Sequence, residues 1–493
     1  MEPSPAPREL VVIAKPDVGL RVTDEGLKSL NDASLASLDE LLVGESILLE
    51  PLFGLSEELL DRRSRSAFGD EATLSQFYRV TASDERLESL VEQFRNDPAV
   101  ITAFIKPGAE LALMTSESAP APPVQPALLT RDLSGEQRYL GDAPEGTNAI
   151  AAWNYPGGGG AGIRIIDIEG AWRFTHEDLT ENSGGVAGGT ETSSRHWRNH
   201  GTAVLGILSG DRNQVTNFGI IGICPDANVR GVSLFGQPAS HLPFHAGTPA
   251  AIRQAADLLR KGDILVIEVQ LPGPEVGFQV NSEQRGYIPV EWWPDALAAI
   301  QYAVSKDVIV IEAAGNGGSN LDDHIFDQNP LPPFGPFPPG WQNPFREGNP
   351  SSGAILVGAG APWRNLNGGR WGPDRSRLAF SNYGTRLDAQ GWGYEVTTCG
   401  FGNLQAGVDE DRWYTPDFGG TSSAAPMVAG ALACVQGALL AANRPLLTPS
   451  EARQLLRETG SPQVDADPGE NRPATQKIGS LPNILEMLTY QGL

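Results

Sequence analysis

The chain contains only three cysteines among its 493 residues, Cys224, Cys399 and Cys434. So few cysteines exclude the disulfide framework that holds many small secreted domains together. Basic residues are also scarce, with 36 Lys+Arg against 60 Asp+Glu and a formal net charge of −24. This deficit argues against nucleic acid or an anionic membrane as the main partner, because both bind clustered positive charge.

The N-terminus lacks both the basic segment and the apolar segment of a secretory signal. We therefore expect a cytoplasmic protein, with export by a leaderless route as the alternative. Long apolar runs are rare as well. The uncharged run at 423–442 is long enough to span a membrane, but it consists mostly of Ala, Gly and Val. Such a weakly apolar run predicts a buried central helix and no membrane span.

Residues 1–115 are predicted to form a small domain of their own. Apolar runs alternate with helical patterns in the order β-α-β-β-α-β, which is typical of a ferredoxin-like α+β unit. One helix places Leu87, Leu90, Val91 and Phe94 at the spacing of a single buried face. Residues 54–74 follow no clear pattern. A Pro-rich linker is predicted at 116–137, where it is exposed and easily cut.

Residues 138–493 are predicted to form one α/β domain with a doubly wound, mostly parallel sheet. Short runs rich in Ile and Val alternate with helical stretches, and their apolar character on both faces suits a sheet covered on both sides. The predicted strands are 163–168, 229–234, 264–269, 308–311 and 355–357, and the predicted helices are 201–209, 249–261 and 295–305.

Three short motifs place reactive side chains where a strand ends or a helix begins. Asp167 ends an apolar strand, His200 opens a helix in Asn-His-Gly-Thr, and Ser422 follows a glycine turn in Gly-Gly-Thr-Ser. A nucleophilic serine needs an imidazole to take its proton and a carboxylate to orient that imidazole. Taken singly, each residue has an ordinary structural explanation, such as a helix cap. The three together predict a catalytic triad.

The order Asp, His, Ser with these flanking residues resembles the subtilisin-like serine peptidases, or subtilases, over roughly residues 138–490. The segment Ala313-Ala314-Gly315-Asn316 resembles the subtilase strand that ends in an oxyanion-binding Asn. The resemblance implies that Asp167 orients His200, that His200 is the general base and acid, and that Ser422 is the nucleophile. The Asn316 side chain and the Ser422 backbone N–H would then hold the oxyanion.

The resemblance also implies an edge strand that pairs with the substrate, here Gln270, Leu271, Pro272 and Gly273, together with Gly315. Pro272 departs from the family pattern, and because it lacks an N–H we expect one backbone donor to the peptide to be missing or displaced. Glu169 replaces a small residue after the Asp strand. Its carboxylate either raises the pKa of His200 or points to solvent, and we expect the solvent-facing arrangement.

The resemblance implies the function of the N-terminal domain too. Subtilases commonly carry a ferredoxin-like propeptide that assists folding and inhibits by laying its tail in the active site. We therefore expect a serine endopeptidase, inhibited or self-processed by residues 1–115, which acts on protein or peptide substrates. The alternative is a catalytically silent regulatory or peptide-binding protein that retains this domain. No cofactor is required. Calcium is possible, and its weak candidates are Asp178, Asn213 and Asn217.

Overall fold

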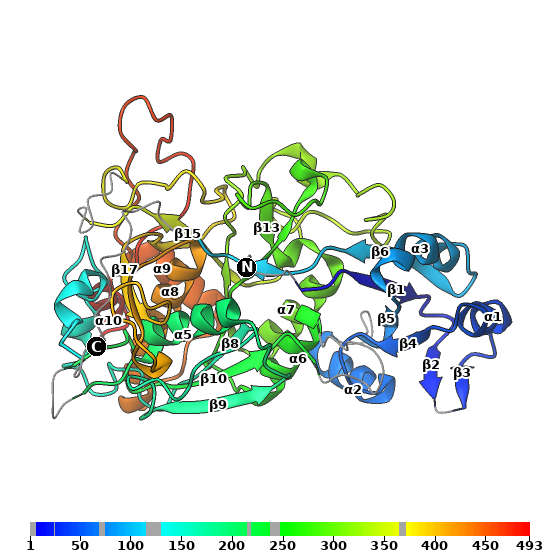
Figure 1. Ribbon diagram of the computed structural model, residues 1–493, viewed down its shortest axis with the longest axis horizontal. Coiled ribbons are helices and arrows are strands. Elements are labelled where there is room, and N and C mark those ends of the chain that lie inside the picture. The colour runs from blue at the N-terminus through cyan, green and yellow to red at the C-terminus, as the bar shows by residue number, and fades with distance from the viewer. Residues whose placement is uncertain are drawn as a thin grey trace.

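The computed structural model describes residues 6–23, 25–68, 74–114, 130–213, 218–236, 247–363 and 371–493. In Figure 1 a small N-terminal unit (residues 6–106) lies at the right and a large C-terminal unit (residues 130–493) at the left. After the last strand of the small unit the chain continues as a tail (residues 107–114) that enters the large unit (Figure 1). The predicted linker lies largely outside the described residues, whereas Leu133 at its end is already buried.

The N-terminal unit contains a four-stranded antiparallel sheet in the order β4-β5-β1-β6. Helix α3 packs on this sheet through the four apolar residues predicted from its spacing, all of them buried. The ferredoxin-like α+β fold predicted from the sequence is confirmed. Its elements are β1 (Glu9–Ala14), α1 (Ala36–Glu45), β4 (Leu48–Pro51), β5 (Phe77–Thr81), α3 (Leu87–Arg95) and β6 (Val100–Lys106).

Two additions to this unit were not predicted. A hairpin joins β2 (Leu20–Thr23) to β3 (Gly26–Ser29), and helix α2 (Glu57–Phe68) occupies much of the stretch that followed no clear pattern. Helix α2 is rich in Glu and Arg, so its few apolar residues give only a weak periodic signal.

The small sheet is apolar on both faces, because successive side chains of a strand point to opposite sides. Leu10 and Val12 of β1 pack into the core of the N-terminal unit itself. Val11, Ile13 and Phe104 point the other way and join the core of the large unit. The second face of the small sheet is therefore an interface between the two units.

The large unit contains a seven-stranded, wholly parallel sheet in the order β16-β15-β14-β11-β8-β10-β9. The doubly wound α/β prediction is confirmed, and only the edge strands β9 and β16 were not predicted. The strands are β8 (Arg164–Glu169), β9 (Ser183–Gly188), β10 (Asn228–Ser233), β11 (Ile264–Ile267), β14 (Ile309–Ala313), β15 (Ile355–Gly360) and β16 (Ala389–Trp392).

Helices cover this sheet, and two of them, α5 (Arg195–Ser209) and α8 (Thr421–Ala441), pack against each other. Another contacting pair is α6 (Gly247–Leu258) and α7 (Pro294–Ser305), which lies toward the N-terminal unit in Figure 1. The other α-helices in the described part of the large unit are α4 (Ala149–Ala152), α9 (Pro449–Thr459) and α10 (Ile484–Tyr490).

Among the described residues, α8 is the one helix long and apolar enough to cross a membrane, and 89% of its apolar window is buried inside the protein. Its position against β14, β15 and β16 is that of a central core helix.

A small antiparallel sheet lies beside the large one and joins the tail to the C-terminal unit. Strand β12 (Val269–Pro272) pairs with β13 (Tyr287–Pro289) on one side and with β7 (Glu110–Leu111) of the tail on the other. A separate two-stranded ribbon is formed by β17 (Val396–Cys399) and β18 (Tyr414–Phe418).

Candidate active site

Ser422 lies in the first turn of α8, and its side chain is completely buried. The preceding Gly420 has φ +98°, a left-handed conformation that favours glycine, and a Cβ there would lie 2.2 Å from the carbonyl oxygen of Ala112. The Ser422 backbone N–H donates to that same oxygen over 3.2 Å. The positive end of a helix dipole therefore faces a carbonyl of the tail.

His200 extends from α5 into the same buried region, where its ring packs edge-on against Phe418. Its Nδ1 is hydrogen-bonded to a carboxylate oxygen of Glu169. Its Nε2 is buried and has no hydrogen-bond partner within the described part of the chain. The Ser422 hydroxyl donates to the Glu268 carbonyl oxygen, 3.3 Å away. The imidazole is thus oriented by a carboxylate on one side and unengaged on the other.

The carboxylate that orients His200 is not the one we expected. Asp167 accepts a hydrogen bond from the Trp172 indole over 2.7 Å, and the structure gives it no bond to His200. Glu169 is fully buried, so the expectation that it faces solvent is wrong. Both residues lie on the same face of β8, but Asp167 sits about 6.6 Å further from the carboxyl end of the strand. The longer side chain at the very end of β8 is the one that meets α5.

Burial sets the electrostatics of this group. It raises the pKa of both Asp167 and Glu169 well above the usual range, and the nearby Glu169 raises that of Asp167 further. Burial lowers the pKa of His200 to about 3 and that of His196, on the same helix, to about 4. An isolated charge is therefore costly here. Glu169 and His200 share one proton in the hydrogen bond between the carboxylate and Nδ1.

Asn316 follows β14 and lies next to the start of α8, as predicted. Its Oδ1 accepts from the backbone N–H of Thr421 over 2.9 Å, one residue before Ser422. Its Nδ2 donates to Gln284 Oε1 over 2.9 Å. Gly315 supports the same corner, because its N–H donates to the Thr421 hydroxyl. The amide that the sequence assigned to oxyanion binding is thus oriented by Thr421, the residue before Ser422.

Tail residues occupy the edge of β12. Val269 and Gln270 pair with Leu111 and Glu110, and the Ala112 N–H donates to the Glu268 carbonyl oxygen over 3.3 Å. Beyond Ala112, the Met114 N–H donates to the Gly419 carbonyl oxygen over 3.3 Å. The tail therefore passes directly across Ser422.

Of the predicted edge residues, only Gln270 contacts the tail. Leu271 and Pro272 pair with β13, and the Gly273 N–H donates to the Gly286 carbonyl oxygen. The pairing with the tail stops at Gln270, so the loss of a backbone donor at Pro272 stays a prediction. The edge that the tail contacts therefore runs from Glu268 to Gln270 and overlaps the predicted stretch at Gln270.

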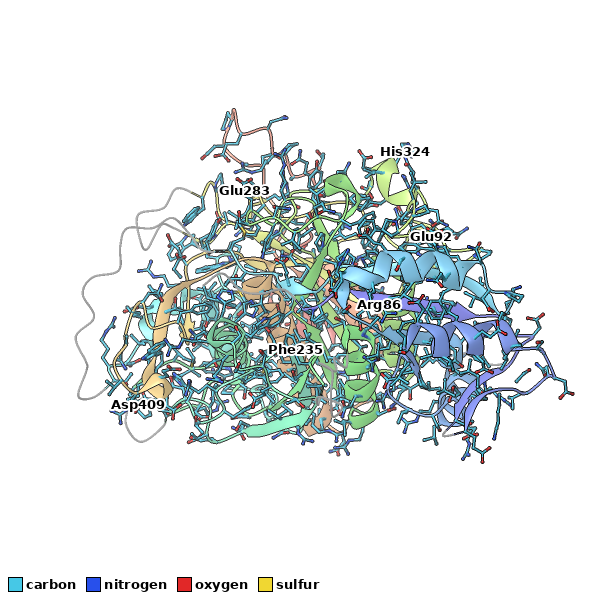
Figure 2. The ribbon with its side chains drawn as sticks, turned by 45° about the vertical axis from the view of Figure 1, so that its right-hand side comes forward. Arg86, Glu92, Phe235, Glu283, His324 and Asp409 are labelled. Carbon is cyan, nitrogen blue, oxygen red and sulfur yellow. The ribbon has the colours of Figure 1, made fainter. Side chains whose placement is uncertain are left out.

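Two side-chain amides add contacts that the sequence did not reveal. Gln270 Nε2 and Gln284 Nε2 both donate to the Leu111 carbonyl oxygen, over 3.2 and 2.8 Å. Gln284 has φ +55° and belongs to the loop marked by Glu283 in Figure 2. A loop residue of this kind leaves no periodic signal in a sequence.

Glu110 of the tail is held by the Tyr287 hydroxyl over 2.8 Å. Burial raises the pKa of this carboxyl to about 7, although the hydrogen bond from Tyr287 opposes the shift.

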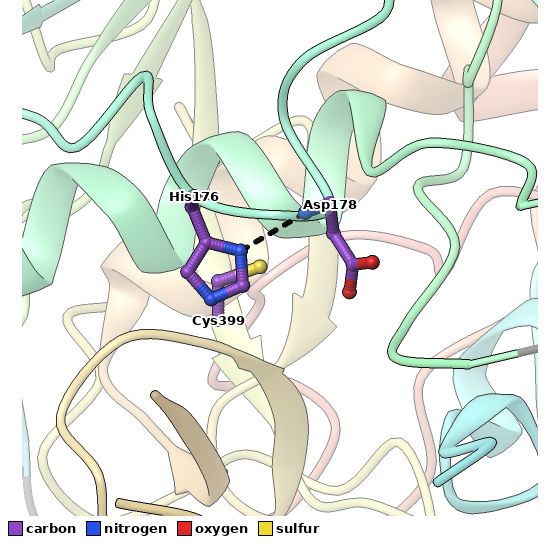
Figure 3. Close-up of side chains that lie close together, drawn as sticks. All are labelled: His176, Asp178 and Cys399. Carbon is purple, nitrogen blue, oxygen red and sulfur yellow. Dashed lines mark hydrogen bonds between the residues drawn. The ribbon is translucent and has the colours of Figure 1, made fainter. Parts of the chain in front are cut away.

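The ligand atoms of His176, Asp178 and Cys399 lie within 4.8 Å of one another (Figure 3). His176 Nδ1 accepts from the Asp178 N–H, and its Nε2 bonds the Trp413 carbonyl oxygen. The Asp178 carboxylate accepts from the Ile220 N–H, the Tyr414 hydroxyl and the Asn213 amide.

Calcium binds oxygen ligands, and two of these three side chains offer an imidazole nitrogen and a thiol, so this group does not fit calcium. Burial is the main reason that the pKa of His176 falls to about 4 and that of Asp178 rises to about 7. The third calcium candidate, Asn217, lies outside the described residues.

Comparison with known proteins places this site in a family. The model of the subtilase family matches residues 166–476. An alkaline protease of Alkalihalobacillus alcalophilus is 22% identical over 372 residues, which cover 75% of this chain and 80% of the relative.

Two solved structures share the fold at 16% identity. Fervidolysin from Fervidobacterium pennivorans, a keratinolytic enzyme related to subtilisin, gives a TM-score of 0.54 over 99% of this chain and 62% of its own. The epidermin leader peptide processing serine protease of Staphylococcus aureus gives 0.53 over 99% of both chains.

The family match spans the strand that ends in Glu169, the helix of His200 and the glycine turn of Ser422. Peptidases of this kind need no organic cofactor, because the protein side chains supply the nucleophile, the base and the oxyanion donors. This chain belongs to the subtilase family, the serine peptidases that hydrolyse peptide bonds.

Proposed function

We propose that the chain is a serine endopeptidase made as an inhibited precursor, and that it cuts itself between Ala112 and Leu113. The observation that carries this proposal is the hydrogen bond from the Ser422 N–H to the Ala112 carbonyl oxygen, with the tail paired to β12 up to that point. A substrate bound in this way presents the carbonyl of its cleaved bond to the nucleophile.

In the first step, the Ser422 oxygen attacks the Ala112 carbonyl carbon while His200 Nε2 takes the hydroxyl proton. Glu169 holds the imidazole from the Nδ1 side and stabilises its positive charge. The Ala112–Leu113 bond then breaks, and His200 passes the proton to the Leu113 nitrogen. Water attacks the resulting ester by the same route in reverse, which releases the new carboxyl end at Ala112.

The Ser422 N–H is already placed to receive the developing oxyanion. The second donor, Asn316 Nδ2, is bonded to Gln284 and has to exchange this partner for the oxyanion during the reaction. Each such donor is worth about 10²–10³ in rate.

Contacts between the two units support an inhibitory role for the N-terminal unit. Lys106 is buried and bonds Asp295 at the start of α7, and Glu9 lies 2.8 Å from the same ammonium group. Phe104 packs against Phe337 and Trp293, with ring centroids 5.2 and 5.9 Å away. Polar contacts supplement this apolar core.

Those polar contacts reach helix α6 and the loop that contains Pro333. The Ile105 N–H donates to the Pro333 carbonyl oxygen over 2.9 Å, and Arg253 Nε donates to the Phe53 carbonyl oxygen over 3.0 Å. Because the unit is held at several places, we expect it to stay in the cleft after the chain is cut.

The test is intact mass and N-terminal sequencing of the purified full-length protein. Wild type should give a fragment that begins at Leu113, and Ser422→Ala should remain uncut. Ser423→Ala is the matched control, because the neighbouring hydroxyl bonds the Trp392 carbonyl oxygen and not the tail. A folded wild type that stays uncut and cleaves no peptide would favour the silent regulatory alternative.

A further inference from the structure

Glu268 is a buried acid that the mechanism above does not use. It lies between β11 and β12, it is 0% exposed, and neither of its carboxyl oxygens has a hydrogen-bond partner among the described residues. A buried carboxylate without any donor is expensive, whereas the protonated form avoids most of that cost. The side chain of Glu268 is therefore a candidate for a neutral acid.

The strand register places this acid in the catalytic centre. Strand β11 pairs in parallel with β8, with Val266 opposite Asp167 and Ile267 opposite Ile168, so Glu268 comes next to the end of β8. On the large unit, the titratable neighbours of Glu268 are Asp167 and Glu169, and the Ser422 hydroxyl lies beside Glu268. Glu169 is in turn hydrogen-bonded to His200. On the tail side, its backbone carbonyl accepts from Ala112.

The three carboxyl groups differ in what stabilises their negative charge. The Asp167 carboxyl group accepts a hydrogen bond from the indole N–H of Trp172. The Glu169 carboxyl group is hydrogen-bonded to His200 and to the backbone N–H of Gly170. Glu268 has no cation beside it, and the one donor near its otherwise unpartnered carboxyl oxygens is the Ser422 hydroxyl, which partly opposes the rise in its pKa. Of the three carboxyl groups, Glu268 is the one whose negative charge is stabilised least.

Resting on the function proposed above, we propose that Glu268 is a positioning residue that carries a proton in the working enzyme, and that its ionisation at raised pH switches the catalytic centre off. A negative charge beside Ser422 opposes the oxyanion that forms there. The neutral acid removes this repulsion while it fills the same space. Burial and the two neighbouring carboxylates raise the pKa of Glu268 well above its usual range, as this role requires.

The test compares pH profiles of kcat/KM for the processed enzyme and its Glu268→Gln variant, each normalised to its own maximum. The wild-type profile should fall at least about ten-fold on its alkaline side, and the variant should lose that fall, because its amide cannot ionise. The Asp167→Asn variant is the matched control: it should keep an alkaline fall, displaced to lower pH because one of the two carboxylates that raise the pKa of Glu268 is gone. Superimposable profiles of wild type and Glu268→Gln would overturn the proposal.

A second measurement does not depend on activity. The infrared difference spectrum between full-length Ser422→Ala and Ser422→Ala/Glu268→Gln should contain a protonated-carboxyl component of Glu268 that persists above neutral pH. Glu268→Asn replaces the Gln variant if the latter does not fold. A wild type that is inactive at every pH would reject the proposed function, and the infrared band would still decide the protonation of Glu268. Carboxyl bands of equal intensity in the two proteins at every pH would overturn the inference.

Discussion

The ammonium group of Lys106 bonds the carboxylate of Asp295 between the two units, where the side chains are 3% and 0% exposed. Lys106 belongs to the N-terminal unit and Asp295 to helix α7 of the large unit, so the ion pair joins the two units through a buried interface. Removing Lys106 leaves the buried Asp295 without its cation, which is far more costly than the loss of a surface pair.

We therefore expect Lys106→Met, in the uncut Ser422→Ala background, to lower the free energy of unfolding by about 3–5 kcal/mol. Denaturant unfolding followed by fluorescence measures this change. Lys28→Met is the control, because the Lys28–Glu25 pair is exposed and its loss should cost less than about 1 kcal/mol. Equal effects of the two substitutions would contradict the buried-pair argument.

The second prediction separates the two carboxylates of β8. Glu169→Gln should lower kcat by about 10³–10⁴, because an amide no longer fixes the tautomer and charge of His200. Asp167→Asn should cost about ten-fold or less, since its partner is the Trp172 indole. Steady-state kinetics on a peptide substrate measures both, with folding checked by circular dichroism. A larger loss for Asp167→Asn would restore Asp167 as the residue that orients His200.

The third prediction concerns the pH dependence of tail binding. The pKa of Glu110 is raised from 4.5 to about 7 in the cleft, so the bound state takes up a proton more readily than the free state. Binding is therefore strongest below pH 4.5, weakens as the pH rises from 4.5 to 7, and is constant above that range. The expected loss is about ten-fold to a hundred-fold.

A synthetic peptide of residues 107–112, used as a competitive inhibitor of the processed enzyme, measures this effect. The same peptide with Glu110→Gln is the control, because the ratio of the two inhibition constants cancels any titration of the enzyme itself. A ratio that does not change with pH would show that Glu110 does not titrate in the cleft.

The fourth prediction concerns the group of His176, Asp178 and Cys399. Asp178→Asn should lower stability by about 1–3 kcal/mol, because the hydrogen bonds from Ile220, Tyr414 and Asn213 are optimal for a carboxylate. The loss should be the same with added calcium and with a chelator. Thermal unfolding of wild type and variant under both conditions tests this. Stabilisation of wild type by calcium that Asp178→Asn abolishes would instead place a cation there.

Much of this architecture was predictable, because the dominant signals are local. The burial face of α3 follows from residues spaced along one helix, and the parallel sheet follows from short runs that are apolar on both sides. The positions of His200, Asn316 and Ser422 follow from motifs at the ends of such elements.

The features that were not predictable depend on strand register and on contacts between side chains that lie far apart in the sequence. Asp167 and Glu169 lie two residues apart on one strand face, and the sequence alone does not say which of them meets α5. The pairing of the tail with Val269 and Gln270 was not predictable for a similar reason, because a strand pattern does not define which residues of two strands lie opposite each other. Gln284 reaches the cleft from a loop without a pattern.

The apolar second face of the small sheet has a kinetic consequence. If the N-terminal unit leaves after cleavage, it exposes Val11, Ile13 and Phe104, which are now fully or almost fully buried. A free domain with such an exposed apolar patch is prone to aggregation or proteolysis, and either process removes it from solution. Activation would then be irreversible, and its rate would be set by the dissociation of the N-terminal unit from the peptidase.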